Sequence, residues 1–505
     1  MSIPEPSRVE IDGIPVWAVQ SADPPQVTLT FAVGRLDEGP MDAGTAHLVE
    51  HLVMRRVGRS HLDSNATTHA GFIDFVVRGP AEEVADHIAR VCDAIRTFDE
   101  ISDEDVSAEI AAIVSELGEH DENTGSGSLY YRFGPAGPGI LEYGSPRHRS
   151  ITRNDAVQFV RRWFVTGNAA ADVIGDIPPA LRFPLPAGRR RDPRSVPREI
   201  EQTYPLISAS AAASLSMSIV VEGGATTRAL AFMTLDEALM ERLRTQRGLI
   251  YDSSVSQASI TENRVVLVAD LDPSREHLDD CLEALIGLLA ELSETGGSDD
   301  LIGHSRKKLL VEVGGRSMYE RQAAMAAVAE LNGEHFASQQ MLIDAITAVD
   351  IAEVQSVLRG CLSTLLITVG HEVDEGRAES LGLTWRLPPA EHDEFGVGWR
   401  QLSRKFASSA VVVLEGRRRS NAAGSVIVIA EDRLDWFGAG AGITVRPDDI
   451  AHVQIDPEGI VLVDTWSGFD LVVSPTDIRD KKGDIRAFFE RVAPSRISFR
   501  QTKWL

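Results

Sequence analysis

Two histidines and a glutamate within five consecutive residues have the spacing of a metal site. His47, Glu50 and His51 form the pattern H-x-x-E-H. Residues four apart lie on the same face of a helix, so His47 and His51 can offer their imidazoles to one ion. Zinc binds two imidazoles and a carboxylate and keeps a fourth position for water, whose pKa it brings to about 7. Glu50 can take the proton as that water attacks a carbonyl. These residues therefore predict zinc-dependent hydrolysis.

The third ligand should be an acidic side chain on a helix that faces the first one. Glu109 and Glu116 are seven residues apart, which places them on one face of a predicted helix. The residues between them are mostly apolar, so we expect part of this helix to be buried, where a carboxylate needs a partner. We predict that Glu116 binds the metal and that Glu109 supports a ligand from behind. The alternative is that both lie at the solvated end of an acidic helix.

The elements that would position these side chains alternate between strands and helices. In order, we expect a strand at 27–33, a helix at 43–56 carrying the motif, a strand at 72–78, a helix opened by Pro80, and a helix at 102–117. The order recurs in the second half, with a strand at 217–221, a helix at 227–244, a strand at 265–271 and a helix after Pro273. This recurrence predicts a duplicated α+β domain.

Composition changes mark the domain boundaries. A segment rich in proline and arginine follows the first half, Pro388 and Pro389 follow the second, and short strands with one last helix at 484–492 complete the chain. Many short strands indicate a barrel or sandwich, and their order resembles a pleckstrin-homology-like barrel. The predicted divisions are a zinc-binding domain at 1–180, a semi-rigid, solvated linker at 181–200, a second α+β domain at 201–385 and a β-rich domain at 400–505.

The composition excludes several classes of protein. The chain has 505 residues, 43% of them hydrophobic, and a formal net charge of −25, which should repel nucleic acid and anionic membranes. No apolar run approaches the roughly 18–20 residues of a membrane span, and no secretory signal is expected at the N-terminus. Three widely separated cysteines predict a reducing cytoplasm. If the acidic stretch between Glu82 and Glu122 lines the substrate chamber, it would favour basic peptides.

The sequence resembles the inverzincins of the pitrilysin and insulinase type, which include mitochondrial processing peptidases and their bacterial relatives. H-x-x-E-H is the signature of that family. The other matching segments are Asp37-Glu38, Gly44, Asn65-Ala66-Thr67-Thr68, the pair Glu109 and Glu116, Tyr143-Gly144-Ser145-Pro146, Gly175-Asp176, and Leu243 to Tyr251 (LRTQRGLIY). The resemblance covers roughly residues 10 to 375.

By this resemblance the chain is a zinc-dependent endopeptidase that cleaves peptides or small unfolded proteins. Glu116 would be the zinc ligand, and Asn65, Ala66 and Thr67 would form an edge strand that pairs with extended substrate. From His51 to Glu116 is 65 positions, fewer than is usual in the family. A shortened segment around residues 55–63 would account for the difference.

The resemblance also assigns two residues of the second half to the reaction. Arg244 and Tyr251 would contact the substrate carbonyl and stabilise the oxyanion. Without the resemblance, Arg244 would form a surface salt bridge on a helix, and Tyr251 would be a half-buried aromatic at the end of a strand. Relatives of this length close the chamber by dimerising, so we expect a homodimer or a heterodimer in which this pair serves the zinc of the partner.

Three alternatives remain open from the sequence. The chain could be a non-catalytic or weakly catalytic subunit that keeps the fold. The C-terminal module could be an adaptor that binds an unknown partner. The enzyme could instead be a dedicated maturation peptidase that trims a leader from a small peptide.

Overall fold

A computed structural model describes residues 5–117, 127–144, 150–209, 215–370, 373–386, 412–417, 425–438, 441–480 and 482–499. The sequence landmark Ser145-Pro146 and the boundary at Pro388-Pro389 lie outside these residues. Among the described residues, no helix combines the length and the apolar character that crossing a membrane requires.

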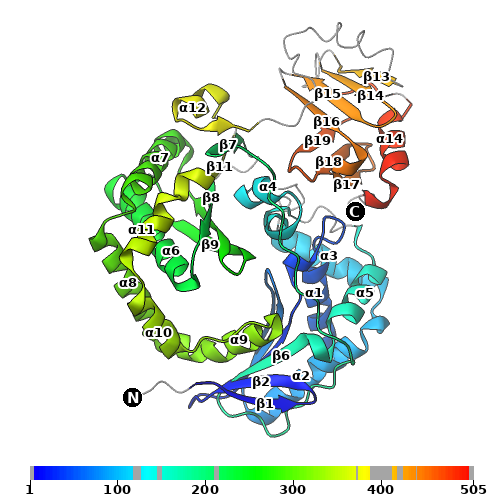
Figure 1. Ribbon diagram of the computed structural model, residues 1–505. Helices are drawn as coiled ribbons and strands as arrows, with labels where there is room; N and C mark the ends of the chain where they lie inside the picture. The colour runs from blue at the N-terminus through cyan, green and yellow to red at the C-terminus, as the bar shows by residue number, and fades with distance from the viewer. Residues whose placement is uncertain are drawn as a thin grey trace.

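The first domain is a mixed sheet with helices packed on one face (Figure 1). Across the sheet its strands are β1 Ser7–Ile11, β2 Ile14–Val19, β6 Ala169–Ile174, β3 Gln26–Phe31, β5 Ile73–Arg78 and β4 Asp63–Thr68. Its helices are α1 Thr45–Val57, α2 Ala81–Arg96, α3 Asp103–Leu117 and α5 Arg153–Trp163. Strand β4 is an edge of the sheet and runs antiparallel to β5.

The second domain repeats this topology. Its strands lie in the order β12 Thr384–Trp385, β7 Leu206–Ala209, β11 Leu366–Val369, β8 Leu215–Glu222, β10 Arg264–Leu271 and β9 Ser253–Thr261. The helices are α6 Ala225–Leu239, α7 Leu278–Thr295, α8 Asp299–Gly314, α9 Arg316–Asn332, α10 Gln339–Ala348, α11 Ile351–Arg359 and α12 Glu375–Ser380. Both sheets have a parallel pair, β2 with β6 or β7 with β11, beside antiparallel strands, and they differ at one edge: β1 is antiparallel to β2, whereas β12 is parallel to β7. The predicted pair of duplicated α+β domains is confirmed.

Each domain covers the open face of the other domain's sheet. Helix α9 of the second domain packs on β2 and β6, where Ala327 and Leu331 meet Ala170. In return, helix α4 (Ser128–Phe133), whose chain comes from the first half, places Leu129 and Phe133 on strands of the second sheet. The exchange joins the two sheets into one curved body (Figure 1).

The segment at 181–200 differs from the solvated linker predicted from its composition. It contains no helix or strand, but Leu181 and Phe183 are buried in the core of the first domain. Arg194 donates to both carboxylate oxygens of Asp37, at 2.9 and 2.5 Å, and to the carbonyl oxygen of Gly71 at 2.8 Å. The sequence showed the proline-rich composition but not these partners, which lie more than 100 residues away.

The C-terminal domain packs two small sheets and a helix around its own core. One sheet holds β13 Val412–Glu415, β14 Val426–Ile429, β15 Leu434–Gly438 and β16 Ala441–Val445. The other holds β19 Asp470–Val473, β18 Val461–Thr465, β17 Ile450–Ile455 and β20 Ile497–Phe499, and the helix is α14 Asp484–Val492. The predicted order of strands followed by a helix is present, and β20 after the helix is an addition to it.

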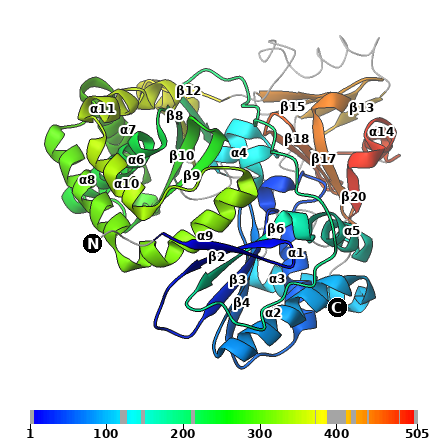
Figure 2. The ribbon, with the colours of Figure 1, turned by 60° about the horizontal axis from the view of Figure 1, so that its bottom comes forward.

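Buried polar contacts hold this domain against the first half of the chain. Figure 2 shows β17 and β18 beside α4, as does Figure 1. Tyr130 of α4 donates to Asp470 at 2.7 Å, and Tyr143 donates to Asp464 at 2.5 Å. The guanidinium of Arg386 lies 3.8 Å from the ring centroid of Phe469 and donates to backbone carbonyls of the C-terminal domain.

Candidate metal centre

The start of helix α1 is fixed by a buried carboxylate. Glu38 is 7% exposed, and its two oxygens accept from the backbone N–H groups of Gly44 (3.2 Å) and Ala46 (2.6 Å). These are N–H groups that the helix itself cannot satisfy. Burial raises the pKa of Glu38 to about 7, and the two backbone donors oppose this rise. The capped turn leads directly into His47.

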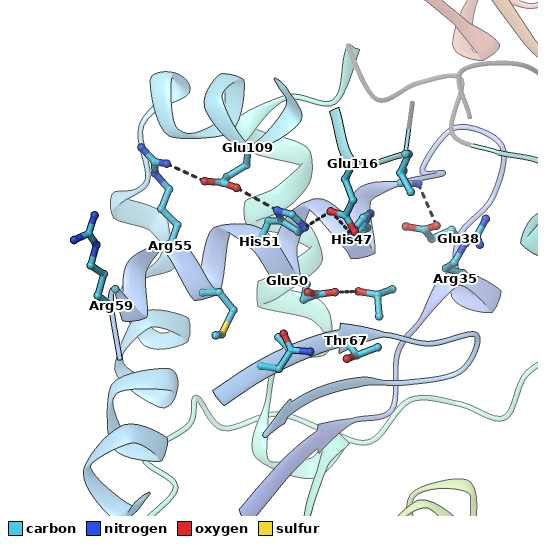
Figure 3. Close-up of a pocket in the computed structure, with 17 residues that line it drawn as sticks. Arg35, Glu38, His47, Glu50, His51, Arg55, Arg59, Thr67, Glu109 and Glu116 are labelled. Atoms are coloured by element: carbon cyan, nitrogen blue, oxygen red, sulfur yellow. Dashed lines mark hydrogen bonds and ion pairs between the residues drawn. The ribbon is translucent and has the colours of Figure 1, made fainter. Parts of the chain in front are cut away.

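Helices α1 and α3 bring three potential metal ligands together (Figure 3). The Oε2 atom of Glu116 lies 4.0 Å from Nε2 of His47 and 3.5 Å from Nε2 of His51. One ligand atom from each of the three side chains lies within 4.8 Å of the other two. Ligands about 2 Å from a tetrahedral zinc ion stand about 3.3 Å apart, so modest rotamer changes would close this set around zinc. Two imidazoles and a carboxylate fit that metal.

The charge states of the two imidazoles suit metal binding. Burial, followed by the neighbouring His51, lowers the pKa of His47, which favours the neutral imidazole that a metal needs. The rings of His47 and His51 are 4.7 Å apart between centroids and almost perpendicular, at 83°. Glu116 is the least buried of the three, with 56% of its side chain exposed.

Glu109 lies behind His51, on the side away from Glu116. Its Oε2 is 3.2 Å from Nδ1 of His51, and its Oε1 accepts from Arg55 at 2.8 Å. Arg55 also donates to Asp105 at 2.8 Å. A carboxylate on Nδ1 orients the imidazole and leaves Nε2 directed at the metal position. The sequence pointed to Glu109 but not to Arg55, whose i, i+4 spacing from His51 was the available signal.

Glu50 is buried beside the same position. It is 8% exposed, and its Oε2 accepts a hydrogen bond from Thr68 at 2.8 Å. Burial raises the pKa of Glu50, while the Thr68 bond opposes the rise. A raised pKa brings a carboxylate closer to the neutral range in which a general base works best. Thr68 is thus a further residue of the site, at the end of the strand that carries Asn65, Ala66 and Thr67.

These side chains line a cleft of about 980 Å³ between α1, α3 and the edge strand β4. Asn65, Ala66 and Thr67 are among the lining residues, and the exposed side chains of Asn65 and Thr67 alternate with the buried Ala66. The cleft is also lined by cations that sequence reasoning did not single out, namely Arg35, Arg55 and Arg59.

Arg244 and Tyr251 lie elsewhere, in the second domain. Arg244 belongs to a π-helical segment, Met240–Gln246, that continues α6, and its guanidinium lies 5.3 Å from the ring centroid of Tyr251. Tyr251 is 76% exposed. The two residues are close to each other, but neither is among the described residues that line the metal cleft.

A second group of reactive side chains lies in the C-terminal domain. Nε2 of His452 is 2.7 Å from the hydroxyl of Ser498, and its Nδ1 is 3.1 Å from Asp464. This is the order of a serine hydrolase triad. However, all three residues are at most 4% exposed, so substrate has no access to the hydroxyl. Asp464 also accepts from Tyr143, so the group serves to attach this domain.

Comparison with known proteins finds similarity in structure and not in sequence. No protein-family model and no curated protein matches the chain. A peptidase M16 inactive domain from Pseudomonas fluorescens superposes with a TM-score of 0.58 at 13% identity, over 73% of this chain and 98% of that one. The first half of the periplasmic protease PqqL from Escherichia coli gives 0.54 at 15% identity, over 75% and 96%.

A third solved structure extends the likeness to a longer protein. Pitrilysin superposes with a TM-score of 0.52 at 16% identity, over 72% of this chain and 44% of pitrilysin. Over about three quarters of its length, this chain therefore has the half-clamshell fold of the M16 peptidases.

Proposed function

We propose that this protein is a zinc-dependent endopeptidase. The observation that carries the proposal is the convergence of His47, His51 and Glu116, whose ligand atoms lie within 4.8 Å of one another in a cleft beside a free strand edge. His47, His51 and Glu116 would hold the ion. When bound, zinc supplies a Lewis acid that polarises the peptide carbonyl and acidifies water.

The protein's own groups carry the proton transfers. Glu50 accepts a proton from the attacking water, because it is the buried carboxylate beside the ligands and is not itself needed as one. The oxygen of that water adds to the carbonyl carbon, and Glu50 returns the proton to the leaving amine as the C–N bond breaks. The Thr68 hydroxyl holds Glu50 in place through its 2.8 Å bond. Glu109 holds His51 in the orientation that the ligand set requires.

The free edge of β4 is the proposed substrate platform. A peptide added there as a further strand would be bound mainly through its backbone, and Asn65, Ala66 and Thr67 would face it. This mode suits extended peptides and unfolded segments rather than folded proteins.

Arg244 and Tyr251 are proposed to act from a partner subunit. Their mutual proximity and the exposure of Tyr251 fit a pair that meets substrate at an interface between chains. A homodimer would then bring the pair of one protomer to the cleft of the other, where a phenol and a guanidinium could stabilise the oxyanion.

The test replaces the proposed base. Glu50→Gln should bind zinc with the stoichiometry of the unaltered protein and should hydrolyse an unstructured quenched peptide at least about 100-fold more slowly. Glu294→Gln, which changes an exposed glutamate of α7, is the matched control and should remain active. Full activity in Glu50→Gln would remove the proposed mechanism.

A non-catalytic subunit is the second candidate, because one similar structure is described as an inactive M16 domain. Zinc content separates the two candidates before any substrate is known. A purified protein that binds no zinc at a stoichiometric level would favour the non-catalytic subunit. Bound zinc without turnover of any peptide would instead favour a dedicated maturation enzyme with a narrow substrate.

A further inference from the structure

Three arginines line the metal cleft, and their guanidinium groups differ in the partners that they already have within the protein. Arg55 bonds to Glu109 and Asp105, both at 2.8 Å. Arg35 donates to the backbone carbonyl of Ile140 at 3.3 Å. Arg59 is exposed and makes no hydrogen bond or ion pair with any residue in the described part of the chain. Arg59 therefore offers an uncommitted guanidinium inside the cleft.

The carboxylates of the cleft do not compensate Arg59. The lining carboxylates in the described residues are Glu38, Glu50, Glu109 and Glu116. Glu38 accepts backbone N–H groups, Glu50 accepts from Thr68, Glu109 bonds to Arg55, and Glu116 lies against the two imidazoles. The lining counts three arginines against four carboxylates, so the two positive charges of a bound zinc would change its formal charge from −1 to +1.

The acidic stretch between Glu82 and Glu122 adds little negative charge to the cleft. Of its described members, only Glu109 and Glu116 line the cleft. Its acids on helix α2, such as Glu82, Asp86 and Asp93, are exposed and belong to another surface. The expected preference for basic peptides concerned the whole substrate chamber and stays a prediction; within the cleft itself, the described part of the stretch adds only these two acids.

Arg59 also lies at a defined place relative to the reacting bond. Figure 3 shows it beyond Arg55, at the end of α1 away from His47. Helix α1 ends at Val57, six positions or about 9 Å along the axis from His51, and Arg59 follows two residues beyond that end. An extended peptide covers that distance in three or four residues. Because β4 runs alongside this part of the cleft, a strand added to its edge would pass Arg59.

We propose that the cleft contains a subsite for an acidic side chain, with Arg59 as its specificity-determining residue, three or four residues from the scissile bond of an extended peptide. This inference rests on the proposed function, because the position of the subsite is counted from the peptide bond that the enzyme would cleave. Its ligand chemistry is a carboxylate, which a guanidinium can bind through two parallel hydrogen bonds.

The experiment measures binding and cleavage separately. The probes are three fluorescein-labelled peptides of one neutral, unstructured sequence with a single Glu, Gln or Lys at the same position. Their affinities for the Glu50→Gln protein are measured by fluorescence anisotropy, with zinc and without it. In parallel, the zinc-loaded unaltered protein is incubated with the Glu peptide, and the cleaved bond is located by mass spectrometry.

The Glu peptide should bind about ten-fold more tightly than the Lys peptide, with the Gln peptide between them. Adding Arg59→Gln should bring the three affinities within about two-fold, and Arg59→Glu should reverse their order. Arg96→Gln is the matched control, since Arg96 is exposed on α2, outside the cleft, and its loss changes the net charge equally. Cleavage should occur three or four residues from the Glu.

Three results would overturn the subsite: equal affinities for the Glu and Lys peptides, no measurable binding, or a preference that survives Arg59→Gln. Cleavage at bonds unrelated to the Glu would also count against it. If no peptide is cleaved but the Arg59-dependent preference persists in binding, the proposal of a general endopeptidase fails and the acidic subsite stands.

Discussion

The Nδ1 atom of His51 lies 3.2 Å from Oε2 of Glu109, on the side of the ring opposite to Glu116. One helix, α3, thus supplies both the carboxylate proposed to bind the metal and the carboxylate that orients a ligand. Their separation of two helical turns places them on either side of the same imidazole. Arg55 neutralises Glu109 from behind, which keeps this carboxylate fixed when no metal is bound.

Replacing Glu109 should weaken zinc binding without removing a ligand. In Glu109→Gln we expect the zinc dissociation constant to rise about 10-fold to 100-fold, because the amide lacks the charge that makes His51 a better donor. Isothermal titration calorimetry with zinc measures the change. Glu104→Gln, at an exposed position of the same helix, should bind zinc as the unaltered protein does. Unchanged affinity in Glu109→Gln would show that Glu109 contributes no more than Glu104.

Replacing Glu116 should have a larger effect. Glu116→Gln removes a charged ligand, so we expect zinc affinity to fall by more than about 100-fold while the unfolding transition of the metal-free protein stays the same. The side chain is 56% exposed and makes no buried contact that the fold would need. If Glu109→Gln abolished zinc binding and Glu116→Gln spared it, the assignment of the third ligand would be reversed.

The site was predictable to the extent that it is local. His47, Glu50 and His51 share one helix, so their spacing alone fixed their common face. Glu116 comes from 65 positions further on; its spacing from Glu109 and the apolar residues between them suggested it, and the resemblance to a known family pointed to the same acid. Thr68 belongs to a segment that the resemblance had indicated, but its contact with Glu50 could not be predicted, because that contact depends on the register between a strand and a helix.

In the fold, too, local features could be predicted from the sequence and contacts between distant segments could not. Helices with a clear apolar face and strands of β-branched residues were predicted within a few residues of their observed bounds, as for α2 and β10. Strands β1 and β2 were missed because β1 is short, exposed and mostly polar, and because β2 contains Pro15, which counts against a strand. The crossing of α4 and α9 onto each other's domains, and the attachment of the C-terminal domain, depend on contacts between distant segments that no local pattern encodes.

The attachment of the C-terminal domain should depend on Tyr143. Its hydroxyl donates to Asp464 at 2.5 Å, and both residues are fully buried. Tyr143→Phe leaves a buried carboxylate short of a donor, at a cost of about 1–3 kcal/mol. We expect faster hydrogen exchange in β18 and in residues 127–144, with β8 to β10 unchanged.

Tyr319→Phe provides the control for that experiment. Tyr319 is half-buried on α9, away from the C-terminal domain, so its variant should leave exchange in β18 at the original rate. Unchanged protection in Tyr143→Phe would mean that the apolar and backbone contacts around Arg386 suffice to hold the domain in place.

A buried carboxylate away from the cleft should make stability depend on pH. Asp172 lies in β6, is 3% exposed, and has one oxygen, Oδ1, without a hydrogen-bond partner in the described structure. Burial, helped by the nearby Asp74, raises the pKa of Asp172 to about 7, against a weaker opposing hydrogen bond from Thr28. In the folded protein the carboxyl therefore keeps its proton to a higher pH than in the unfolded chain.

The sign of the dependence follows from this difference. Between about pH 4 and pH 7 the folded state holds a proton that the unfolded state releases, so this group makes stability fall as the pH rises. In Asp172→Asn the side chain is neutral at every pH. We expect the variant to exceed the unaltered protein in the free energy of unfolding by on the order of 2–4 kcal/mol at about pH 8, and by a smaller amount, on the order of 1–2 kcal/mol, at about pH 5. Urea unfolding at both pH values measures this, with the exposed Asp176→Asn as control. Equal stability of Asp172→Asn and the unaltered protein at pH 8 would show that the buried carboxylate is ionised at no cost.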